Sequence, residues 1–114
     1  MADELHKKKC VPCKGGIPPF DIKEIHKYLK KINGWEVNNK NSSYFLEKNY
    51  KFKNFNTSQL FVNEVGKIAE SESHHPDIHF GWGYAKIIIF THAIKGLAES
   101  DFILASKIDQ IKIN

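Results

Sequence analysis

The chain has 114 residues, of which 41% are hydrophobic and 12% aromatic, and it carries a formal net charge of +4. This length predicts one domain, and this composition excludes an intrinsically disordered chain. All 17 basic residues are lysine. Because arginine is the usual bidentate reader of guanine and phosphate, we expect no direct nucleic-acid binding as the main function. The two cysteines exclude a disulfide framework and favour a reducing, cytoplasmic setting.

The N-terminal segment MADELHKKKC has no apolar stretch, so we expect neither a secretory signal nor, anywhere in the chain, a membrane-spanning helix. Residues 1–17 are predicted to be a flexible arm and residues 18–114 the domain. Cys10 and Cys13 form a C-x-x-C pair within the arm. Such a pair can be half of a zinc site or a redox pair. A zinc site would need a second cysteine pair, which the sequence lacks, and a redox motif would follow a strand, which is not predicted before Cys10. Two reduced thiols are therefore the favoured interpretation.

The first predicted element of the domain is a helix. Apolar residues recur at helical spacing from Phe20 to Ile32, which predicts a helix over about 20–33. A short strand at 35–37 and an aromatic strand at 44–52 follow.

The second half of the domain repeats this order. Asn56 or Thr57 is expected to cap a second helix, which runs to about Ser71. Two strands and a C-terminal helix follow, over residues 77–80, 82–92 and 99–112. The whole order predicts an α+β fold: a two-layer domain with an antiparallel four-stranded sheet and three helices on one face.

The stretch SHHPDIHF contains His74, His75 and His79, which suggests a metal site. However, adjacent residues such as His74 and His75 point to opposite sides of an extended chain. Pro76 also disfavours a helix at His75, which a metal-binding pair with His79 would need. A metal site would require more distant ligands such as His92 and Asp101.

The alternative is acid/base chemistry. Histidine gains and loses a proton near neutral pH, so two histidines from separate elements can flank a substrate as acid and base. His74 lies just past the second predicted helix, and His92 ends the apolar strand. A hydrogen-bonded core position for His92 and a polar loop for His74 and His75 explain the same spacing equally well.

A longer pattern extends beyond this cluster. From Glu70 to Asp101 the sequence reads E-S-E-S-H-H-P-x5-W-x9-H-x8-D, and His92 follows a threonine. This pattern resembles the pterin-4a-carbinolamine dehydratase family, in which these residue types recur at these separations. The likeness covers residues 18–112.

The resemblance implies dehydration of 4a-hydroxytetrahydropterin to quinonoid dihydropterin and water, without a metal or other cofactor. It implies that His74 and His92 are the acid/base pair and that His75 binds and orients the pterin. Asp101 and Glu70 would position or polarise the histidines. An aromatic wall near the flat ring would come from Trp35 or Trp82. His79 is expected to be a bystander.

The resemblance also implies a homodimer with an extended sheet, or a homotetramer. In animal members it implies a second role as dimerisation cofactor of a homeodomain transcription factor, and with it a nuclear as well as a cytoplasmic location. One departure concerns the last helix: Ala98 stands where the family commonly carries Ser or Thr. We therefore expect a weakened N-cap, with Ser100 as a later start.

Overall fold

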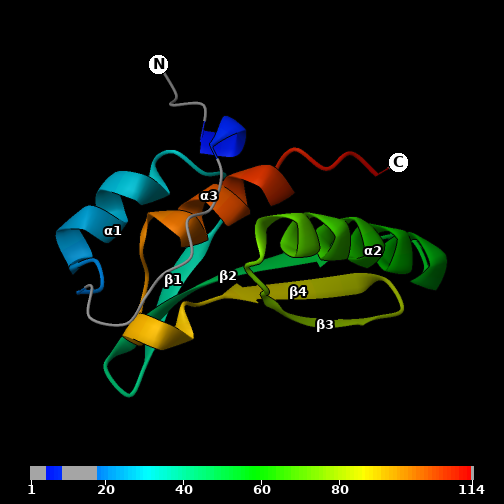
Figure 1. Cartoon of the computed structure of the whole chain (residues 1–114). Coiled ribbons are helices and arrows are strands. Elements are labelled where there is room, and N and C mark those ends of the chain that lie inside the picture. The colour runs from blue at the N-terminus through cyan, green and yellow to red at the C-terminus, as the bar shows by residue number, and fades with distance from the viewer. Residues whose placement is uncertain (1–4, 9–17, 114) are drawn as a thin grey trace.

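The computed structural model describes residues 5–8 and 18–113 of the chain. Its elements are η1 (Leu5–Lys7), α1 (Ile22–Leu29), β1 (Glu36–Lys40), β2 (Ser43–Lys51), α2 (Phe55–Glu72), β3 (Asp77–Gly81), β4 (Tyr84–Ile89), η2 (His92–Ile94) and α3 (Glu99–Ile108). The three α-helices lie on one face of the sheet (Figure 1). The predicted α+β architecture is confirmed.

The sheet is antiparallel throughout, in the order β1-β2-β4-β3. Its two faces differ because side chains alternate along each strand. Leu46 pairs with Ile89 across β2 and β4, and both are fully buried beneath the helices. The neighbouring positions, Phe45 and Ile88, are half-buried and belong to the opposite face, which no α-helix covers.

Side-chain caps set where the first two α-helices begin. The Asp21 carboxylate accepts a hydrogen bond from the Glu24 N–H at 2.9 Å, and the Asn54 side chain accepts one from the Thr57 N–H at 2.8 Å. The prediction that Asn56 or Thr57 caps α2 is therefore wrong. Asn54 is extended and caps the first turn, with Thr57 as its donor.

Other boundaries also differ from prediction, because tertiary hydrogen bonds compete with local ones. The helix predicted over 20–33 ends at Leu29; beyond it, the Asn33 N–H donates to the Asp109 carboxylate at 3.0 Å. The last helix ends at Ile108, not at residue 112, and Asp109 is its C-cap.

The limits of two predicted strands, one in each hairpin, also change. The strand predicted over 82–92 is shorter, Tyr84–Ile89, because residues 82–83 make the hairpin turn with Gly83 at φ +79°. The strand predicted over 35–37 is longer, Glu36–Lys40. It continues until a two-residue turn reverses the chain into β2.

Part of the predicted N-terminal arm packs against the domain. Leu5 is 1% exposed within the core. The Lys107 ammonium donates to the His6 carbonyl at 2.8 Å, and Lys8 pairs with Glu99 at 3.2 Å. The cysteine pair at 10 and 13 lies outside the described residues. Within the described ranges, no helix is long and apolar enough to cross a bilayer.

Candidate active site

The end of α2 places the two adjacent histidines. Ser73 adopts a left-handed conformation at φ 52° and caps the helix through its N–H, which reaches the carbonyls of Ala69 and Glu70. The His74 N–H also bonds to the Ala69 carbonyl, at 3.1 Å. The chain then leaves the helix at once, so His74 and His75 lie in the short link between α2 and β3.

The side chain of His74 ends on a buried carboxylate. Its Nε2 lies 2.8 Å from Oδ1 of Asp101, whose side chain is 0% exposed, while the His74 side chain is 15% exposed. The other oxygen of Asp101 accepts hydrogen bonds from the Thr91 hydroxyl at 2.7 Å and from the Ala98 N–H at 2.8 Å. Three donors therefore converge on one carboxylate that water does not reach.

This contact fixes the tautomer of His74. A carboxylate can only accept hydrogen bonds, so the proton on the His74 ring lies on Nε2. The other ring nitrogen, Nδ1, is then left with its lone pair available for a proton. The same arrangement orients histidine bases in hydrolytic triads, where the carboxylate holds the ring and stabilises the imidazolium that forms.

Asp101 occupies the third position of α3 and also caps it. Ala98 has no side chain that could cap the helix, and Asp101 instead accepts the Ala98 backbone N–H. The helix consequently begins at Glu99. The expectation that Ser100 would begin it later is wrong.

Glu70 faces His75 and not His74. The distance from its Oε2 to His75 Nε2 is 3.4 Å, and the two side chains are 78% and 61% exposed. Exposed pairs of this kind contribute little, since water screens them. Glu70 can therefore influence where the His75 ring lies, but it does not hold that ring as Asp101 holds His74.

His92 lies beyond the end of β4. It begins η2, directly after Thr91. Since the Thr91 hydroxyl bonds to Asp101, the residue before His92 is attached to the carboxylate that holds His74. The His92 ring is exposed and meets the edge of the Phe90 ring at 4.9 Å between centroids. It forms one wall of a hollow of about 500 Å³ on the open face of the sheet.

The two tryptophans lie elsewhere. Trp35 is 7% exposed in the core, and its Nε1 donates to Asp109 at 2.9 Å. Trp82 is 71% exposed in the β3–β4 turn. The length of β3 separates this turn from the histidine pair, about 16 Å at roughly 3.3 Å per residue. The structure does not bring either tryptophan together with His74 and His92, so the aromatic wall stays a prediction.

His79 is separate from the acid/base pair. It lies on β3, where it pairs with Lys86, and it is exposed on the open face. Among the residues that the structure describes, no three His, Cys, Asp or Glu side chains are grouped so that they could hold a metal ion.

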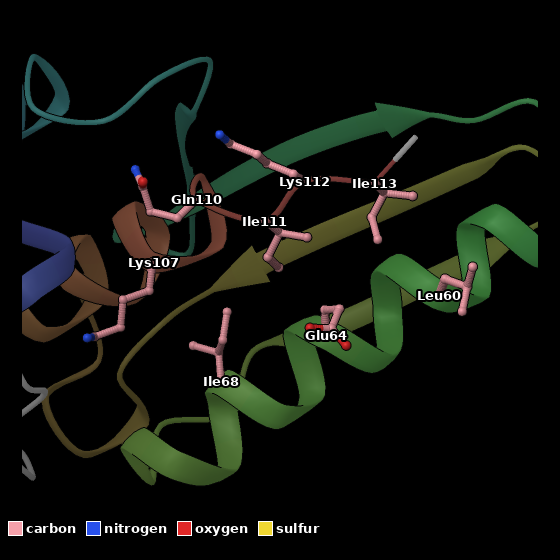
Figure 2. A pocket seen from close by; sticks show the side chains of 8 residues that line it. All are labelled: Leu60, Glu64, Ile68, Lys107, Gln110, Ile111, Lys112 and Ile113. Atoms are coloured by element: carbon pink, nitrogen blue, oxygen red, sulfur yellow. The ribbon is translucent and has the colours of Figure 1, made fainter.

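Another depression lies between α2 and the C-terminal segment (Figure 2). It measures about 390 Å³. Isoleucines from both sides line it, Ile68 from α2 and Ile111 and Ile113 from the segment after α3. Because no histidine is among its lining residues, this groove does not belong to the candidate site.

Comparison with known proteins decides the family. Residues 18–111 match the family model described as pterin 4 alpha carbinolamine dehydratase. The chain belongs to the pterin-4a-carbinolamine dehydratase family. The resemblance stated from the sequence is confirmed.

Several family members are close in sequence. A protein of Rubrobacter xylanophilus, whose name assigns it to the pterin-4-alpha-carbinolamine dehydratases, is 48% identical over 95% of this chain and 98% of its own length. A protein of Rickettsia bellii with the same name is 49% identical over 95% of this chain and 94% of its own length.

The fold of this chain also matches that of a solved structure. A Brucella melitensis protein described as a transcriptional coactivator/pterin dehydratase superposes with a TM-score of 0.72 at 24% identity. The match covers 80% of this chain and 95% of the other. At this identity the likeness supports the fold.

Sequence reasoning did not identify two features of the site. The Thr91 side chain appeared only as a neighbour of His92, although its hydroxyl bonds to Asp101. Phe90 was assigned only to a strand, whereas its ring contacts His92. The alternation of strand residues does place Phe90 on the same face as Ile88, but it does not predict where the chain turns into η2.

Proposed function

We propose that the chain catalyses the dehydration of a 4a-hydroxytetrahydropterin to quinonoid dihydropterin and water by histidine acid/base chemistry. The observation that carries this proposal is the His74–Asp101–Thr91 cluster. Asp101 bonds both to His74 and to Thr91, the residue directly before the second proposed catalytic histidine, His92. The family membership of the chain supplies the substrate class.

The reaction requires two proton movements. The bond between C4a and its hydroxyl oxygen breaks, and that oxygen needs a proton to leave as water. N5 loses its proton, and its electron pair forms the N5=C4a double bond. The overall change is loss of water with no net oxidation or reduction, so a redox cofactor has no part in it.

The two histidines differ in a way that suggests their roles. His74 has Nδ1 available and a carboxylate behind its ring, which suits it to accept the N5 proton. His92 is exposed and can take a proton from water before donating it to the leaving hydroxyl. His75, next to His74, would bind and orient the pterin, and Glu70 would restrict the His75 ring. After each cycle, His74 releases its extra proton to water and His92 takes up a proton from water.

Rates measured on freshly prepared 4a-hydroxytetrahydropterin test this proposal. General acid/base groups contribute about 10²- to 10⁴-fold each, so His74→Ala and His92→Ala should lower kcat by about those factors. His79→Ala is the matched control, since His79 is an exposed histidine on the neighbouring strand, and its kcat should stay unchanged. Wild-type rates in both folded variants would overturn the assignment.

We also propose that the chain forms a homodimer or homotetramer. Two features support this. β3 is an outer strand of the sheet, so one of its edges has no partner strand among the residues that the structure describes. Phe80 and Trp82, at 36% and 71% exposed, add apolar surface beside that edge. Light scattering coupled to size exclusion measures the mass directly, and a monomer at micromolar concentration would contradict the proposal.

The alternative implied by the resemblance is a binding module for a transcription factor, with a nuclear location. The coactivator role belongs to the printed description of the Brucella melitensis protein. No contact among the described residues of this chain favours it over dehydration. We therefore propose dehydration, in the cytoplasm, as the function of this chain.

A further inference from the structure

The described part of the N-terminal arm lies against α3 (Figure 1). We call residues 5–8 the arm segment. Its backbone forms a tight turn, since the Lys8 N–H donates to the Leu5 carbonyl at 2.9 Å. Leu5 is 1% exposed and belongs to the same core cluster as Phe102 and Ile103 of α3. Because the whole leucine side chain is removed from water, the arm segment is held on the domain by a strong apolar contact.

The arm segment helps to cover a helix that is buried on nearly all sides. Eight of the ten residues of α3 are buried, whereas a surface helix usually exposes one polar face. Ser106 bonds its hydroxyl within the helix, by donating to the Ile103 carbonyl at 2.8 Å. Since α3 also carries Asp101, the segments that cover α3 determine where the carboxylate that holds His74 lies.

One lysine of α3 joins the arm segment to the end of α2. The Lys107 ammonium donates to the His6 carbonyl at 2.8 Å and lies 3.6 Å from Oε2 of Glu72, the last residue of α2. The Lys107 and Glu72 side chains are 17% and 11% exposed. Because both charges are largely removed from water, their attraction is screened less than that of a surface pair. The ammonium therefore connects three separate parts of the chain.

This contact and the proposed catalytic one hold the same end of α2. Glu72 precedes His74 by two residues, and only residues 73–76 separate α2 from β3. On α3, Lys107 follows Asp101 by six residues, about 9 Å at 1.5 Å per residue. The end of α2 thus meets α3 at two points, one ionic and one within the proposed site. The short link gives His74 little freedom to compensate for a shift of α2.

We propose that Lys107 is a positioning residue for His74, and that the arm segment keeps Lys107 in place by accepting its hydrogen bond at His6. This inference rests on the proposed dehydratase function, to which it adds residues outside the acid/base pair. An ammonium has three N–H donors; the His6 carbonyl accepts from one and so directs the group toward Glu72. Without this contact the end of α2 moves relative to α3, and a catalytic group displaced by about 1 Å loses about 10²-fold in rate.

The first measurement needs no substrate. The nitrogen and proton chemical shifts of the His74 ring, recorded by NMR, should show the wild-type proton on Nε2, as the contact with Asp101 requires. Lys107→Met removes the ammonium at similar length, and we expect it to give a mixture with the Nδ1–H form. Lys107→Arg restores a cation with several donors and should restore the Nε2–H form. A pure Nε2–H form in folded Lys107→Met would overturn the inference.

A second variant removes the other charge of the pair. Glu72→Gln keeps nearly the same volume, and it should shift the His74 ring in the same direction as Lys107→Met. It also serves as the test if Lys107→Met does not fold. A His74 ring unchanged in Glu72→Gln would mean that the pair does not hold the end of α2, and would contradict the proposal.

The second measurement is kcat on 4a-hydroxytetrahydropterin for the same folded variants. Lys107→Met should lower kcat by about 10- to 100-fold, and Lys107→Arg should recover most of it. Lys67→Met is the matched control, because Lys67 also pairs with a glutamate of α2, Glu64 at 2.9 Å, but with a side chain that is 74% exposed. Its kcat should equal that of the wild type. A loss in Lys67→Met as large as that in Lys107→Met would overturn the inference.

A double-mutant cycle tests the role of the arm segment. Leu5→Ala should loosen η1 and lower kcat, and its combination with Lys107→Met should cause no further loss, because both changes break the same connection. Losses that multiply would show that the arm segment does not act through Lys107. A wild type inactive on the pterin, with a His74 ring that still responds to Lys107→Met, would refute the proposed function alone, so the two failures are distinguishable.

Discussion

The last helix carries an aspartate at each end, and the two aspartates make parallel sets of contacts. Asp101 accepts one backbone N–H, one hydroxyl and His74 Nε2. Asp109 accepts one backbone N–H, the Trp35 indole and the Lys48 ammonium, the last at 2.9 Å. Each carboxylate thus collects three donors, at least two of them from distant parts of the chain.

The two carboxylates differ in the chemistry of the side chains that donate to them. The His74 ring has a second nitrogen that can exchange a proton, whereas the Lys48 ammonium also donates to the Asn33 carbonyl and lies over the Tyr50 and Trp35 rings. Asp109 therefore holds the segment after α1, β2 and α3 together, and neither it nor its three donors line the hollow beside His92. The same arrangement of a carboxylate with three donors supports chemistry at one end of α3 and packing at the other.

The largest expected effect separates the two ends by activity. In Asp101→Asn, an NH2 group replaces one carboxylate oxygen, so either His74 or both the Thr91 hydroxyl and the Ala98 N–H lose their acceptor. We expect kcat for dehydration to fall by about 10²- to 10⁴-fold. Asp109→Asn is the matched control and should keep kcat near wild type in the folded protein. Equal losses of kcat in both variants would remove the distinction.

The second-largest effect concerns the free energy of unfolding and the Asp109 end of α3. In Lys48→Met, Asp109 keeps its charge but loses its cation, although the two side chains are only 16% and 11% exposed. Breaking a buried pair by removing one partner costs about 3 kcal/mol. Urea denaturation should therefore show a loss of that size in the free energy of unfolding, with kcat unchanged at low denaturant. Wild-type stability would mean that solvent already screens the pair.

A smaller effect is expected at Thr91, whose hydroxyl bonds to Asp101 at the catalytic end of α3. Thr91→Val keeps the shape of the side chain but removes the hydroxyl that bonds Asp101 at 2.7 Å. Since Thr91 acts on His74 through Asp101, it is a positioning residue, and we expect a fall in kcat of about tenfold, equal to one hydrogen bond. Thr91→Ser restores the hydroxyl and should restore most of kcat. If the serine variant were as slow as the valine variant, the hydroxyl would not be the cause.

The order of elements could be predicted from the sequence because it depends on local periodicity. Helical spacing from Leu60 to Ala69 and the β-branched run at 87–89 each produce the element they predict. The boundaries were less accurate, because they depend on partners that are far away in the chain. The helix before Trp35 ends early, and the Asn33 N–H beyond it bonds to Asp109, 76 residues later.

The candidate site divides in the same way. Residue types and positions suggested His74 and His92 as acid and base but left their roles open, and the family resemblance then assigned roles to Glu70, His74, His92 and Asp101. The structure brings His74 and Asp101 into contact. The resemblance also named Trp35, with Trp82, as a candidate wall beside the pterin ring. Nothing in the sequence indicates that its indole bonds to Asp109, because the two residues are 74 positions apart. Spacing identifies which residues recur, but only the packing of α3 against the sheet shows which carboxylate each one meets.

The smallest expected effect concerns the hydroxyl of Tyr50, beside the Asp109 cluster. Its oxygen is buried and has no hydrogen-bond partner among the described residues. Burial, with the Asp109 charge as a second cause, raises the pKa of the Tyr50 phenol well above its usual range. Folding therefore favours the neutral phenol. This contribution to stability is complete below the unfolded pKa, about 10, and is lost as pH rises toward the higher folded value.

Tyr50→Phe removes both the unpaired hydroxyl and the titration. At pH 8 we expect the free energy of unfolding to rise by about 1 kcal/mol, the penalty of a buried polar group without a partner. Above pH 10, the wild type should lose stability faster than the variant. Denaturation curves recorded between pH 8 and 11 measure both quantities. If the variant were less stable at pH 8, the hydroxyl would have a partner in solution, and the Asp109 cluster would include a fourth donor.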